Sequence, residues 1–329
     1  MIFSRAPFRI TLAGGGTDLP AFYKKHGSTF LSCAIDKYIY VGFKERLFEK
    51  SVRVQYLDCE EVDKVSDLKH NRARACLESF GYSDAVEVNS SADLSGRSGM
   101  GSSGSYIVAL LAALRAHRGL SIDPEIIASE ACRIELDILK EPVGKQDQYI
   151  AAYGNLTKFS IDTSGKVSSK KIDLDEDLMK KIQKNCMIFY TGVLRNASDV
   201  LKKQQERITD NDSSMLAIQQ IGHESIESIC NGDLDKFGKL MHEHWIHKKS
   251  LSDNVSLNIF EKIYSEAIQS GAALGGKIIG AGGGGFLMLY VNKDHEIVKD
   301  KMNSLNLPQM NWSISSSGVS VSSWQSRIL

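Results

Sequence analysis

The chain has 329 residues, 42% of them hydrophobic and 24% charged, and 40 basic residues balance 40 acidic ones to a formal net charge of zero. This length and composition predict a soluble globular protein of about two domains. A nucleic-acid-binding protein would show a basic surplus or a basic block, so no nucleic-acid partner is expected. Any anionic partner should bind locally, at a site.

The N-terminus and the cysteines favour a cytoplasmic protein. No apolar run approaches the roughly 18 residues of a membrane span, so no membrane partner is expected. Basic residues at positions 5 and 9 interrupt the apolar N-terminal stretch, unlike the pattern of a signal peptide. The six cysteines are far apart and form no CxxC pair. That spacing is typical of free thiols in a reducing compartment rather than of disulfides or a zinc site.

Hydrophobic patterning predicts a strand-rich first half. The expected strands are 2–12, 29–35, 38–43, 52–57 and 85–92. We interpret Asp36-Lys37 as a hairpin turn and residues 60–80 as a charged surface helix. The almost wholly apolar stretch from Tyr106 to Leu114 predicts a helix that is buried on every side. Another helix is expected to begin at Asp123-Pro124.

The second half changes from strands to helices. Its expected elements are a hairpin of 155–161 with 166–172, mostly helical residues 196–248, a helix at 256–270, a glycine-rich turn feeding a strand within 274–291, and one or two closing strands in 311–322. The change of pattern places a domain boundary near 165–175. We therefore expect an N-terminal domain of residues 1–170 and a C-terminal domain of residues 171–329.

The strongest local signal is a glycine- and serine-rich loop, GRSGMGSSG at 96–104, between a strand and the buried helix. Glycines let the backbone approach a ligand closely, and the first amides of a helix favour an anion. The loop therefore predicts a phosphate site, although a serine-capped helix with a flexible entry is the alternative. Ser102 and Ser103 either cap the helix or bind a metal with their hydroxyls.

Common nucleotide fingerprints do not fit this loop. The spacing GxGxxG occurs at 99–104 and again at 280–285. The first match lacks the acidic residue at the end of a second strand, and the second match runs into a strand. No Gly-Lys pair is followed by Ser or Thr, which argues against a P-loop. An NAD-dependent oxidoreductase that uses the first match remains a rival hypothesis.

Two further glycine-rich loops are candidate substrate contacts. The first, AGGGTD at 13–18, ends the N-terminal strand and presents Gly15, Gly16, Thr17 and Asp18. Asp18 is suited to accept hydrogen bonds from substrate hydroxyls, unless the loop is only a tight turn with an exposed acid. The other loop, at 280–285, contributes Gly282 and Gly283 as substrate candidates, unless its glycines serve only to let two backbones pack closely.

Glu135 and Asp147 are the carboxylates that decide the chemistry. Phosphoryl transfer needs a Mg²⁺ that bridges phosphate oxygens and a group that orients the attacking hydroxyl. One carboxylate and one serine hydroxyl would suffice as protein ligands of the metal, and a second carboxylate can take the substrate proton. Their spacing alone does not distinguish such a pair from two acids on a helix surface.

Three segments, in chain order, resemble the motifs of the GHMP kinases, the family that includes galactokinase, homoserine kinase and mevalonate kinase. RAPFRITLAG at 5–14 is similar to the first motif, GMGSSG at 99–104 to the ATP-phosphate loop, and 278–286 to the third motif. The resemblance covers nearly the whole chain. It implies an α+β, two-domain fold, with an N-terminal domain like domain 2 of ribosomal protein S5, a ferredoxin-like C-terminal domain, and ATP bound between them.

The resemblance also assigns roles. It implies Asp147 as the catalytic aspartate, Arg9 as a charge that assists transfer, Asp18 as a ligand of sugar hydroxyls, and Ser103 and Glu135 as ligands of Mg²⁺. The implied ATP-phosphate contacts are Gly96, Ser98, Gly99, Met100, Gly101, Ser102, Ser103 and Gly104. Glycine at position 104, where the family usually has alanine, should not block phosphate binding but costs some helix stability.

Within the family, AGGGTDLP at 13–20 most resembles kinases of D-glycero-D-manno-heptose 7-phosphate. These kinases phosphorylate the anomeric hydroxyl, here giving the 1,7-bisphosphate, on the way to nucleotide-activated heptose for bacterial surface polysaccharide. Fucokinase-type sugar 1-kinases are the nearest alternative. A sugar that already carries a phosphate needs a cationic pocket, for which the candidates are Arg97, Lys145, Arg195 and Lys277.

Other hypotheses remain open. A non-catalytic sensor of sugar or ATP could use the same fold, although the retained Glu135 and Asp147 argue against it. A decarboxylase of the same family would need a mevalonate-type substrate. The histidines at 242, 244 and 247 lack the i,i+4 spacing of a helical zinc pair and are interpreted as part of a surface helix. The sequence leaves the oligomeric state open, a homodimer included.

Overall fold

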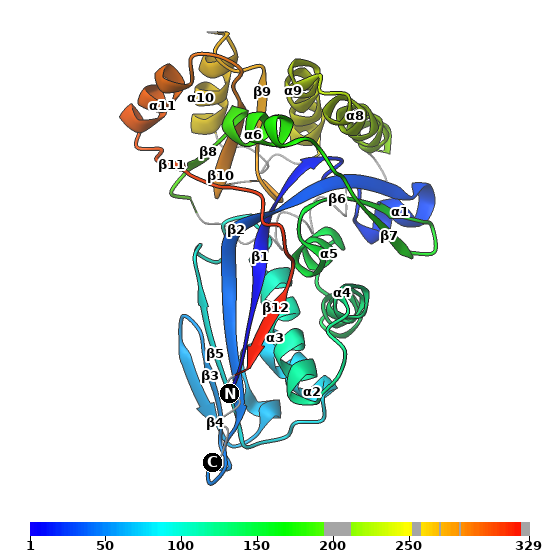
Figure 1. Ribbon diagram of the computed structural model, residues 1–329, viewed down its shortest axis with the longest axis vertical. Helices are drawn as coiled ribbons and strands as arrows, with labels where there is room; N and C mark the ends of the chain where they lie inside the picture. Colours follow the sequence, from blue (N-terminus) through cyan, green and yellow to red (C-terminus); the bar gives the residue numbers. More distant parts are fainter. Residues whose placement is uncertain (194–211, 252–257, 270, 283, 324–329) are drawn as a thin grey trace.

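The computed structural model describes residues 1–193, 212–251, 258–269, 271–282 and 284–323. In this part of the chain the fold is built on two sheets with helices packed against them (Figure 1). The helices are α1 (Pro20–His26), α2 (Asn71–Ser79), α3 (Ser102–His117), α4 (Pro124–Cys132), α5 (Gln146–Tyr153), α6 (Glu176–Asn185), α8 (Asp212–Cys230), α9 (Leu234–Ser250), α10 (Asn258–Gln269) and α11 (His295–Ser304).

The larger sheet has the strand order β12-β1-β2-β5-β3-β4, and β6 pairs with both β2 and β7. Its strands are β1 (Ile2–Ala13), β2 (Ser28–Glu45), β3 (Val52–Gln55), β4 (Cys59–Val62), β5 (Val86–Ala92), β6 (Leu156–Ile161), β7 (Val167–Lys171) and β12 (Ser320–Ser323). All pairs are antiparallel except β3 with β5. Because β12 pairs with β1, the end of the described chain returns to the N-terminal sheet (Figure 1).

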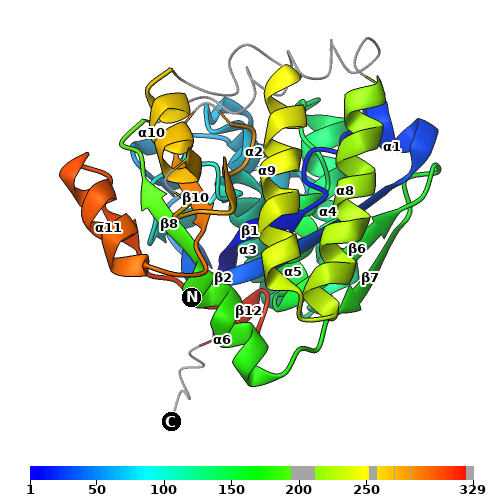
Figure 2. The ribbon, with the colours of Figure 1, turned by 90° about the horizontal axis from the view of Figure 1, so that it is seen from above.

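The smaller sheet is antiparallel, with the order β11-β8-β10-β9. Its strands are β8 (Cys186–Tyr190), β9 (Gly275–Ile278), β10 (Phe286–Tyr290) and β11 (Gln309–Met310). Glycine-rich residues 279–285 therefore connect two strands, whereas the sequence predicted only the second. Helices α8 and α9 lie side by side (Figure 2), and α9 also packs against β9.

The predicted hairpin at Asp36-Lys37 is wrong, because β2 runs unbroken through both residues. The backbone NH of Asp36 donates to Ser313 O at 2.9 Å, and its Oδ1 accepts from Ser313 NH at 3.0 Å. The partner strand β1 follows on both sides, with a register shift between Pro7 and Arg9. A polar pair inside an apolar run here marks a bend that other segments stabilise, not a chain reversal.

The predicted charged helix at 60–80 is only partly correct. Residues Cys59–Val62 form an edge strand, Val65–Asp67 a short 3-10 helix, and only Asn71–Ser79 the α-helix α2. Charged side chains suit an exposed sheet edge as well as a helix surface, so charge alone did not separate the two. The strands expected at 2–12, 52–57, 85–92, 155–161 and 166–172 are confirmed.

Helix α3 is the centre of the N-terminal half and is buried as the sequence predicts. Every side chain from Gly104 to Leu114 is buried, and the helix packs against β1 and β2. Two hydrogen bonds join it to β1: Ser105 Oγ donates to Pro7 O at 2.8 Å, and Ser4 Oγ donates to Ala109 O at 2.6 Å. These bonds fix where the first turn of α3 lies relative to β1.

Candidate active site

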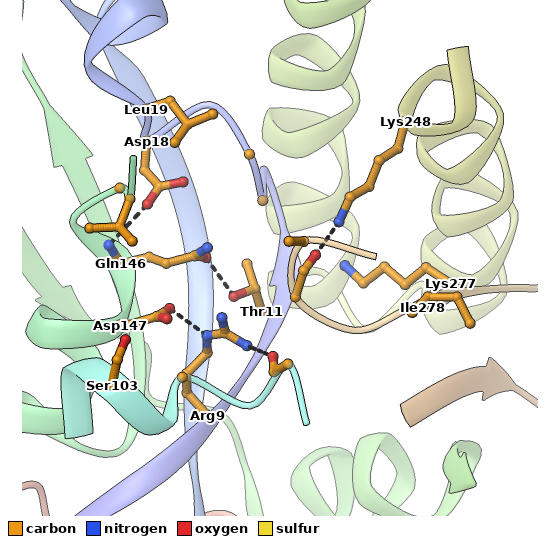
Figure 3. Close-up of a pocket in the computed structure, with 18 of the residues that line it drawn as sticks. Arg9, Thr11, Asp18, Leu19, Ser103, Gln146, Asp147, Lys248, Lys277 and Ile278 are labelled. Carbon is orange, nitrogen blue, oxygen red and sulfur yellow. Dashed lines mark hydrogen bonds and ion pairs between the residues drawn. The ribbon is translucent and has the colours of Figure 1, made fainter. Parts of the chain in front are cut away.

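The three glycine-rich loops meet at one pocket between the two sheets (Figure 3). Many of the predicted site residues line it together. They are Arg9, Gly15, Gly16, Asp18, Arg97, Gly99, Gly101, Ser102, Ser103 and Asp147. Residues that are far apart in the sequence, from β1, the first turn of α3 and the first turn of α5, are thus brought within reach of one ligand.

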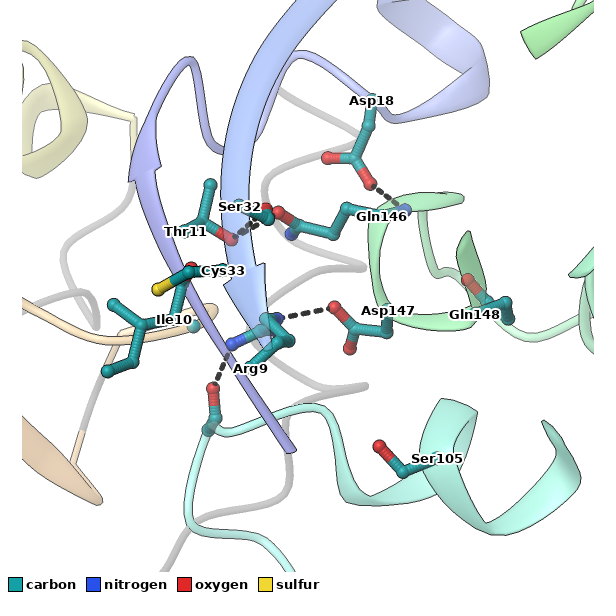
Figure 4. A network of polar contacts seen from close by, with 12 residues as sticks. Arg9, Ile10, Thr11, Asp18, Ser32, Cys33, Ser105, Gln146, Asp147 and Gln148 are labelled. Carbon is teal, nitrogen blue, oxygen red and sulfur yellow. Dashed lines mark hydrogen bonds and ion pairs between the residues drawn. The ribbon is translucent and has the colours of Figure 1, made fainter. Parts of the chain in front are cut away.

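Arg9 joins β1 to the two other walls of the pocket (Figure 4). Its Nε donates to Asp147 Oδ1 at 2.7 Å, and its Nη1 donates to Gly99 O at 2.6 Å. The Arg9 side chain is only 5% exposed, whereas the Asp147 side chain is 24% exposed. The buried guanidinium therefore fixes the orientation of a carboxylate that remains open to the pocket.

Asp18 is held against the start of α5. Its Oδ2 accepts from the backbone NH of Gln146 at 3.0 Å, and a Cβ at Gly144 would lie only 1.9 Å from that oxygen. Burial raises the pKa of the Asp18 carboxyl, the charge of Asp147 adds to this, and the Gln146 NH opposes it. Thr17 is buried and bonds to Gly14 O and Ser28 Oγ, so it shapes the turn and does not line the pocket.

The first turn of α3 presents backbone amides to the pocket. Its N-cap residue, Gly101, has φ 83° and makes no side-chain cap, and no acidic residue lies in the first turn. Ser102 and Ser103 therefore do not supply the side-chain cap that was the alternative to a phosphate site. Unpaired amides and the helix dipole favour an anion at this position. Of the other predicted contacts, Gly96, Ser98, Met100 and Gly104 do not line the pocket.

The loop between β9 and β10 lies behind the α3 loop, backbone to backbone. A Cβ at Gly280 would lie 2.4 Å from Gly99 O, and one at Gly285 would lie 2.1 Å from Ser98 O. This is the close backbone packing that was the alternative interpretation of these glycines. Gly282 does not line the pocket, although Gly280 does, and Gly283 lies outside the described residues.

Glu135 is fully buried and does not line the pocket. Its carboxylate accepts from Arg72 Nε at 3.1 Å and from Gln148 Nε2 at 2.5 Å. Burial raises its pKa, and Arg72 and Gln148 oppose that shift. The Oε1 of Gln148 is buried without a hydrogen-bond partner in the described structure.

The oxygen atoms of Ser103, Glu135 and Gln148 decide whether the chemistry of the site fits Mg²⁺. The Ser103 hydroxyl and the Glu135 carboxylate are the oxygen donors that Mg²⁺ prefers, and the unpaired Gln148 oxygen adds a third acceptor beside Glu135. The donor chemistry therefore fits this ion. Arg72 already compensates part of the carboxylate's charge.

Two of the four cations expected at the pocket, Arg97 and Lys277, line it. Lys145 does not line it: its Nζ donates to Gly165 O and lies 5.3 Å from the centre of the Tyr23 ring. Arg97 lines the pocket, and Arg195 lies outside the described residues. Lys277 lines it as expected.

Two pocket residues that the sequence did not indicate are Lys248 and His244, one turn apart on α9. The HEHWIHKK segment was interpreted as a surface helix, but His244 and Lys248 are buried. The charged residues and histidines on both sides of Trp245 and Ile246 concealed the buried face. No group of three or more metal-ligating side chains occurs in the part of the chain that the structure describes.

Comparison with known proteins gives matches to two family models. Residues 69–155 match the GHMP kinases N terminal domain and residues 225–306 match the GHMP kinases C terminal domain, together more than half of the chain. The D-glycero-alpha-D-manno-heptose 7-phosphate kinase of Campylobacter jejuni is 26% identical, over 91% of this chain and 92% of that protein. The L-fucokinase/L-fucose-1-P guanylyltransferase of Bacteroides fragilis is 23% identical over 91% of this chain. The match spans 35% of the length of that protein.

Solved structures share the fold. A D-glycero-D-manno-heptose 1-phosphate kinase from Bacteroides thetaiotaomicron superposes with a TM-score of 0.78 at 21% identity, covering 99% of this chain and 100% of that chain. Streptococcus pneumoniae phosphomevalonate kinase superposes with a TM-score of 0.77 at 17% identity, covering 96% of this chain and 100% of that chain. The family matches, the shared fold and the converging loops lead to one conclusion: this chain belongs to the GHMP kinase family.

Proposed function

We propose that this protein transfers the γ-phosphate of ATP to the anomeric hydroxyl of a sugar phosphate, with D-glycero-D-manno-heptose 7-phosphate as the favoured acceptor. One observation carries the proposal: the Arg9–Asp147 pair lies directly against the uncapped first turn of α3, in one pocket. The heptose acceptor is favoured by the relative from Campylobacter jejuni, which matches over nearly its whole length.

The residues divide the chemistry among them. The amides at the start of α3 hold the phosphates of ATP, and Arg9 offers positive charge where the transferred group passes. Asp147 orients the acceptor hydroxyl and takes its proton as the oxygen attacks the γ-phosphorus. A new O–P bond forms, the bond between the γ-phosphorus and the bridging oxygen breaks, and ADP leaves with that oxygen. Asp18, beside Asp147, holds the neighbouring sugar hydroxyls.

Ser103 and Glu135 are the residues that would hold Mg²⁺, with Gln148 supporting Glu135 through its amide. When bound, this ion would neutralise charge on the β- and γ-phosphate oxygens of ATP. Arg72 keeps the Glu135 carboxylate in place from the opposite side. Arg72 also forms an ion pair with Glu141, with 3.3 Å between Arg72 Nη2 and Glu141 Oε1. One arginine therefore holds both carboxylates.

Substitution of Asp147 tests the catalytic assignment. Asp147→Asn keeps the size of the side chain and one acceptor oxygen but cannot take a proton at neutral pH. We expect kcat to fall by about 10² to 10⁴, the usual contribution of a general base, with ATP affinity within about threefold of wild type. Turnover can be measured by ADP release and ATP affinity by calorimetry. Turnover at the wild-type rate would remove Asp147 from the mechanism.

A substrate panel tests the acceptor. The purified enzyme with ATP and Mg²⁺ is offered heptose 7-phosphate, heptose, fucose and galactose, and phosphate transfer is followed by mass. We expect the highest kcat/KM with heptose 7-phosphate. A preference for fucose would support the fucokinase-type alternative, and binding of sugar without ATP consumption would support a sensor. Protection by NAD rather than ATP would contradict the kinase proposal.

A further inference from the structure

Two buried lysines in the pocket lack an anionic partner. Lys248, in the last turn of α9, is 7% exposed, and Lys277, in β9, is 4% exposed. Lys248 Nζ donates to Gly280 O at 2.5 Å, and Lys277 Nζ donates to Leu12 O at 3.2 Å. Among the described residues, no carboxylate forms an ion pair with either. Each ammonium has three N–H donors, so most of their capacity is unused.

The lysines face the carboxylates from the opposite wall. Figure 3 shows Lys248 and Lys277 together on one side of the pocket, and Asp18, Gln146 and Asp147 on the other. The space between the two walls is where an acceptor would lie with one end at Asp147. The far end of that acceptor would then reach the two ammonium groups.

His244 lies on the same wall of the pocket as the two lysines. It lies one turn before Lys248 on α9, and its ring Nε2 is 3.3 Å from Gly15 O. Its Nδ1 is buried without a partner in the described structure. Burial and the two neighbouring lysines lower its pKa well below the usual value, so the ring stays neutral. Because Nε2 donates to the carbonyl, a neutral ring leaves Nδ1 as an acceptor, and a hydroxyl of the ligand can donate to it.

We propose that Lys248 and Lys277 form the subsite for the phosphate group that the acceptor already carries, with His244 accepting a hydrogen bond from a hydroxyl of the same substrate. This inference rests on the proposed function and adds the residues that distinguish a sugar phosphate from a free sugar. The ligand class is a phosphate monoester dianion. Its charge matches two ammonium groups, which otherwise bear the full cost of burial.

The charge state of the pair supports this assignment. Burial lowers the pKa of Lys248 to about 8, with Arg9 adding to the shift and Asp18 opposing it. Burial and the charge of Lys248 lower the pKa of Lys277 to about 7. The titratable and charged groups that interact with the two lysines are Arg9, Asp18, Cys33, Cys186 and His244, besides the lysines themselves. A bound dianion would raise both pKa values, so binding near pH 8 should take up protons.

The γ-phosphate of ATP is the other possible source of such an anion. Lys248 bonds to Gly280, which lies against Gly99 of the ATP-phosphate loop, so the two sites adjoin. The two lysines, however, belong to α9 and β9, whereas the amides assigned to ATP belong to α3. The experiment must therefore separate the two substrates.

The test compares Lys248→Met and Lys277→Met with wild type, using Lys239→Met as the matched control. Lys239 is an exposed lysine of the same helix, α9. For each enzyme, kcat and KM are measured for ATP, for heptose 7-phosphate and for heptose. We expect KM for the sugar phosphate to rise at least about tenfold in both variants, as for loss of a charge-assisted hydrogen bond. KM for ATP and kcat/KM for heptose should change less than threefold, and the control should match wild type.

Binding gives a second readout that does not need turnover. Calorimetry with heptose 7-phosphate or inorganic phosphate, in two pH 8 buffers of different ionisation enthalpy, reports proton uptake. We expect proton uptake in wild type and a smaller uptake in both variants, because each variant keeps one of the two lysines. A rise in KM for ATP alone would assign the lysines to the γ-phosphate and overturn the inference, as would unchanged KM for both substrates. If the wild type binds phosphate with proton uptake but transfers to no sugar phosphate, the proposed function fails and the subsite stands.

Discussion

Gly104 lies against Asp147 with no space for a methyl group. A Cβ at position 104 would be 2.8 Å from Asp147 Cβ and 3.1 Å from Gln148 N. The first turn of α3 and the first turn of α5 therefore touch at this point. This contact gives a physical reason for glycine at position 104.

Gly104→Ala should displace α5 and move the Asp147 carboxylate away from Arg9. We expect kcat to fall by about ten- to a hundredfold, because a shift of about 1 Å in a catalytic group can cost that much. Circular dichroism should show an intact fold. Gly96→Ala is the control, since a Cβ there meets nothing within 4 Å and the residue lies in the same loop. Equal kcat in the two variants would mean that the contact does not position Asp147.

Among single residues, the sequence identified those with recognisable motifs better than those whose place depends on packing. Arg9, Asp18, Ser103 and Asp147 were assigned from their motifs and do line one pocket. Lys248 was missed, because burial of a lysine depends on what packs over it, and no local pattern encodes that. Lys145 was expected in the pocket for its charge alone, but its ammonium lies on a carbonyl and a ring elsewhere.

Among the elements, the β9–β10 loop acts as a support for the ATP-phosphate loop. Gly280 and Gly285 each approach the 98–99 backbone too closely to admit a Cβ. The backbone of 99–101 in turn holds Arg9, through Gly99 O and through Met100 O, which accepts from the Arg9 backbone NH at 3.1 Å. Displacement of one loop should therefore displace the next.

Gly280→Ala tests this coupling between loops. Gly280 has φ 77° and a close neighbour, whereas Gly232 has φ 76° and a Cβ there would meet nothing within 4 Å. Gly232→Ala thus carries the same backbone strain, about 1–2 kcal/mol, without the contact. We expect Gly280→Ala to lose more stability than Gly232→Ala in urea unfolding, because only its Cβ meets a neighbour. Only Gly280→Ala should raise KM for ATP, by about tenfold or more. A matching rise in Gly232→Ala would attribute the effect to strain and not to loop packing.

Two of the elements that the sequence predicted wrongly depend on long-range contacts. The apolar runs on either side of Asp36-Lys37 belong to one strand, since Ser313 from the far end of the chain satisfies the polar groups in its middle. Strand β9 was hidden in a glycine-rich segment because it pairs with β10 and packs under α9, both long-range features. Local periodicity found the strands with alternating faces and the wholly buried α3, where pattern and environment agree.

For the molecule as a whole, the pocket exists only where the two sheets meet. Asp147 and the α3 amides belong to the larger sheet's layer of helices, while Lys248 and Lys277 belong to α9 and to the smaller sheet. Gly222 of α8 lies against Gly14, because a Cβ at Gly222 would be 2.8 Å from Gly14 Cα. Helix α8 therefore covers part of the first glycine-rich loop. No helix in the described ranges has the length and apolar character needed to span a bilayer.

The two buried lysines should make the ligand-free protein less stable than its packing allows. The pKa of Lys277 falls from 10.5 to about 7 on folding, so between about pH 7 and pH 10.5 the unfolded chain binds more protons than the folded one. The free energy of unfolding should therefore rise with pH across this window. Below pH 7 both states are protonated, and the whole cost of burying the charge is present.

Lys277→Met removes that cost while keeping a side chain of similar length. We expect the ligand-free variant to be more stable than wild type at pH 7 by about 1–3 kcal/mol, with each pKa unit corresponding to about 1.4 kcal/mol. The difference should shrink toward pH 10, because the wild-type lysine is then neutral in the fold. Urea unfolding of both proteins at pH 7 and pH 9.5 measures it. A variant less stable than wild type at pH 7 would show that contacts within the fold stabilise the Lys277 ammonium. A phosphate ligand would then not be needed to explain why Lys248 and Lys277 lie buried in the pocket.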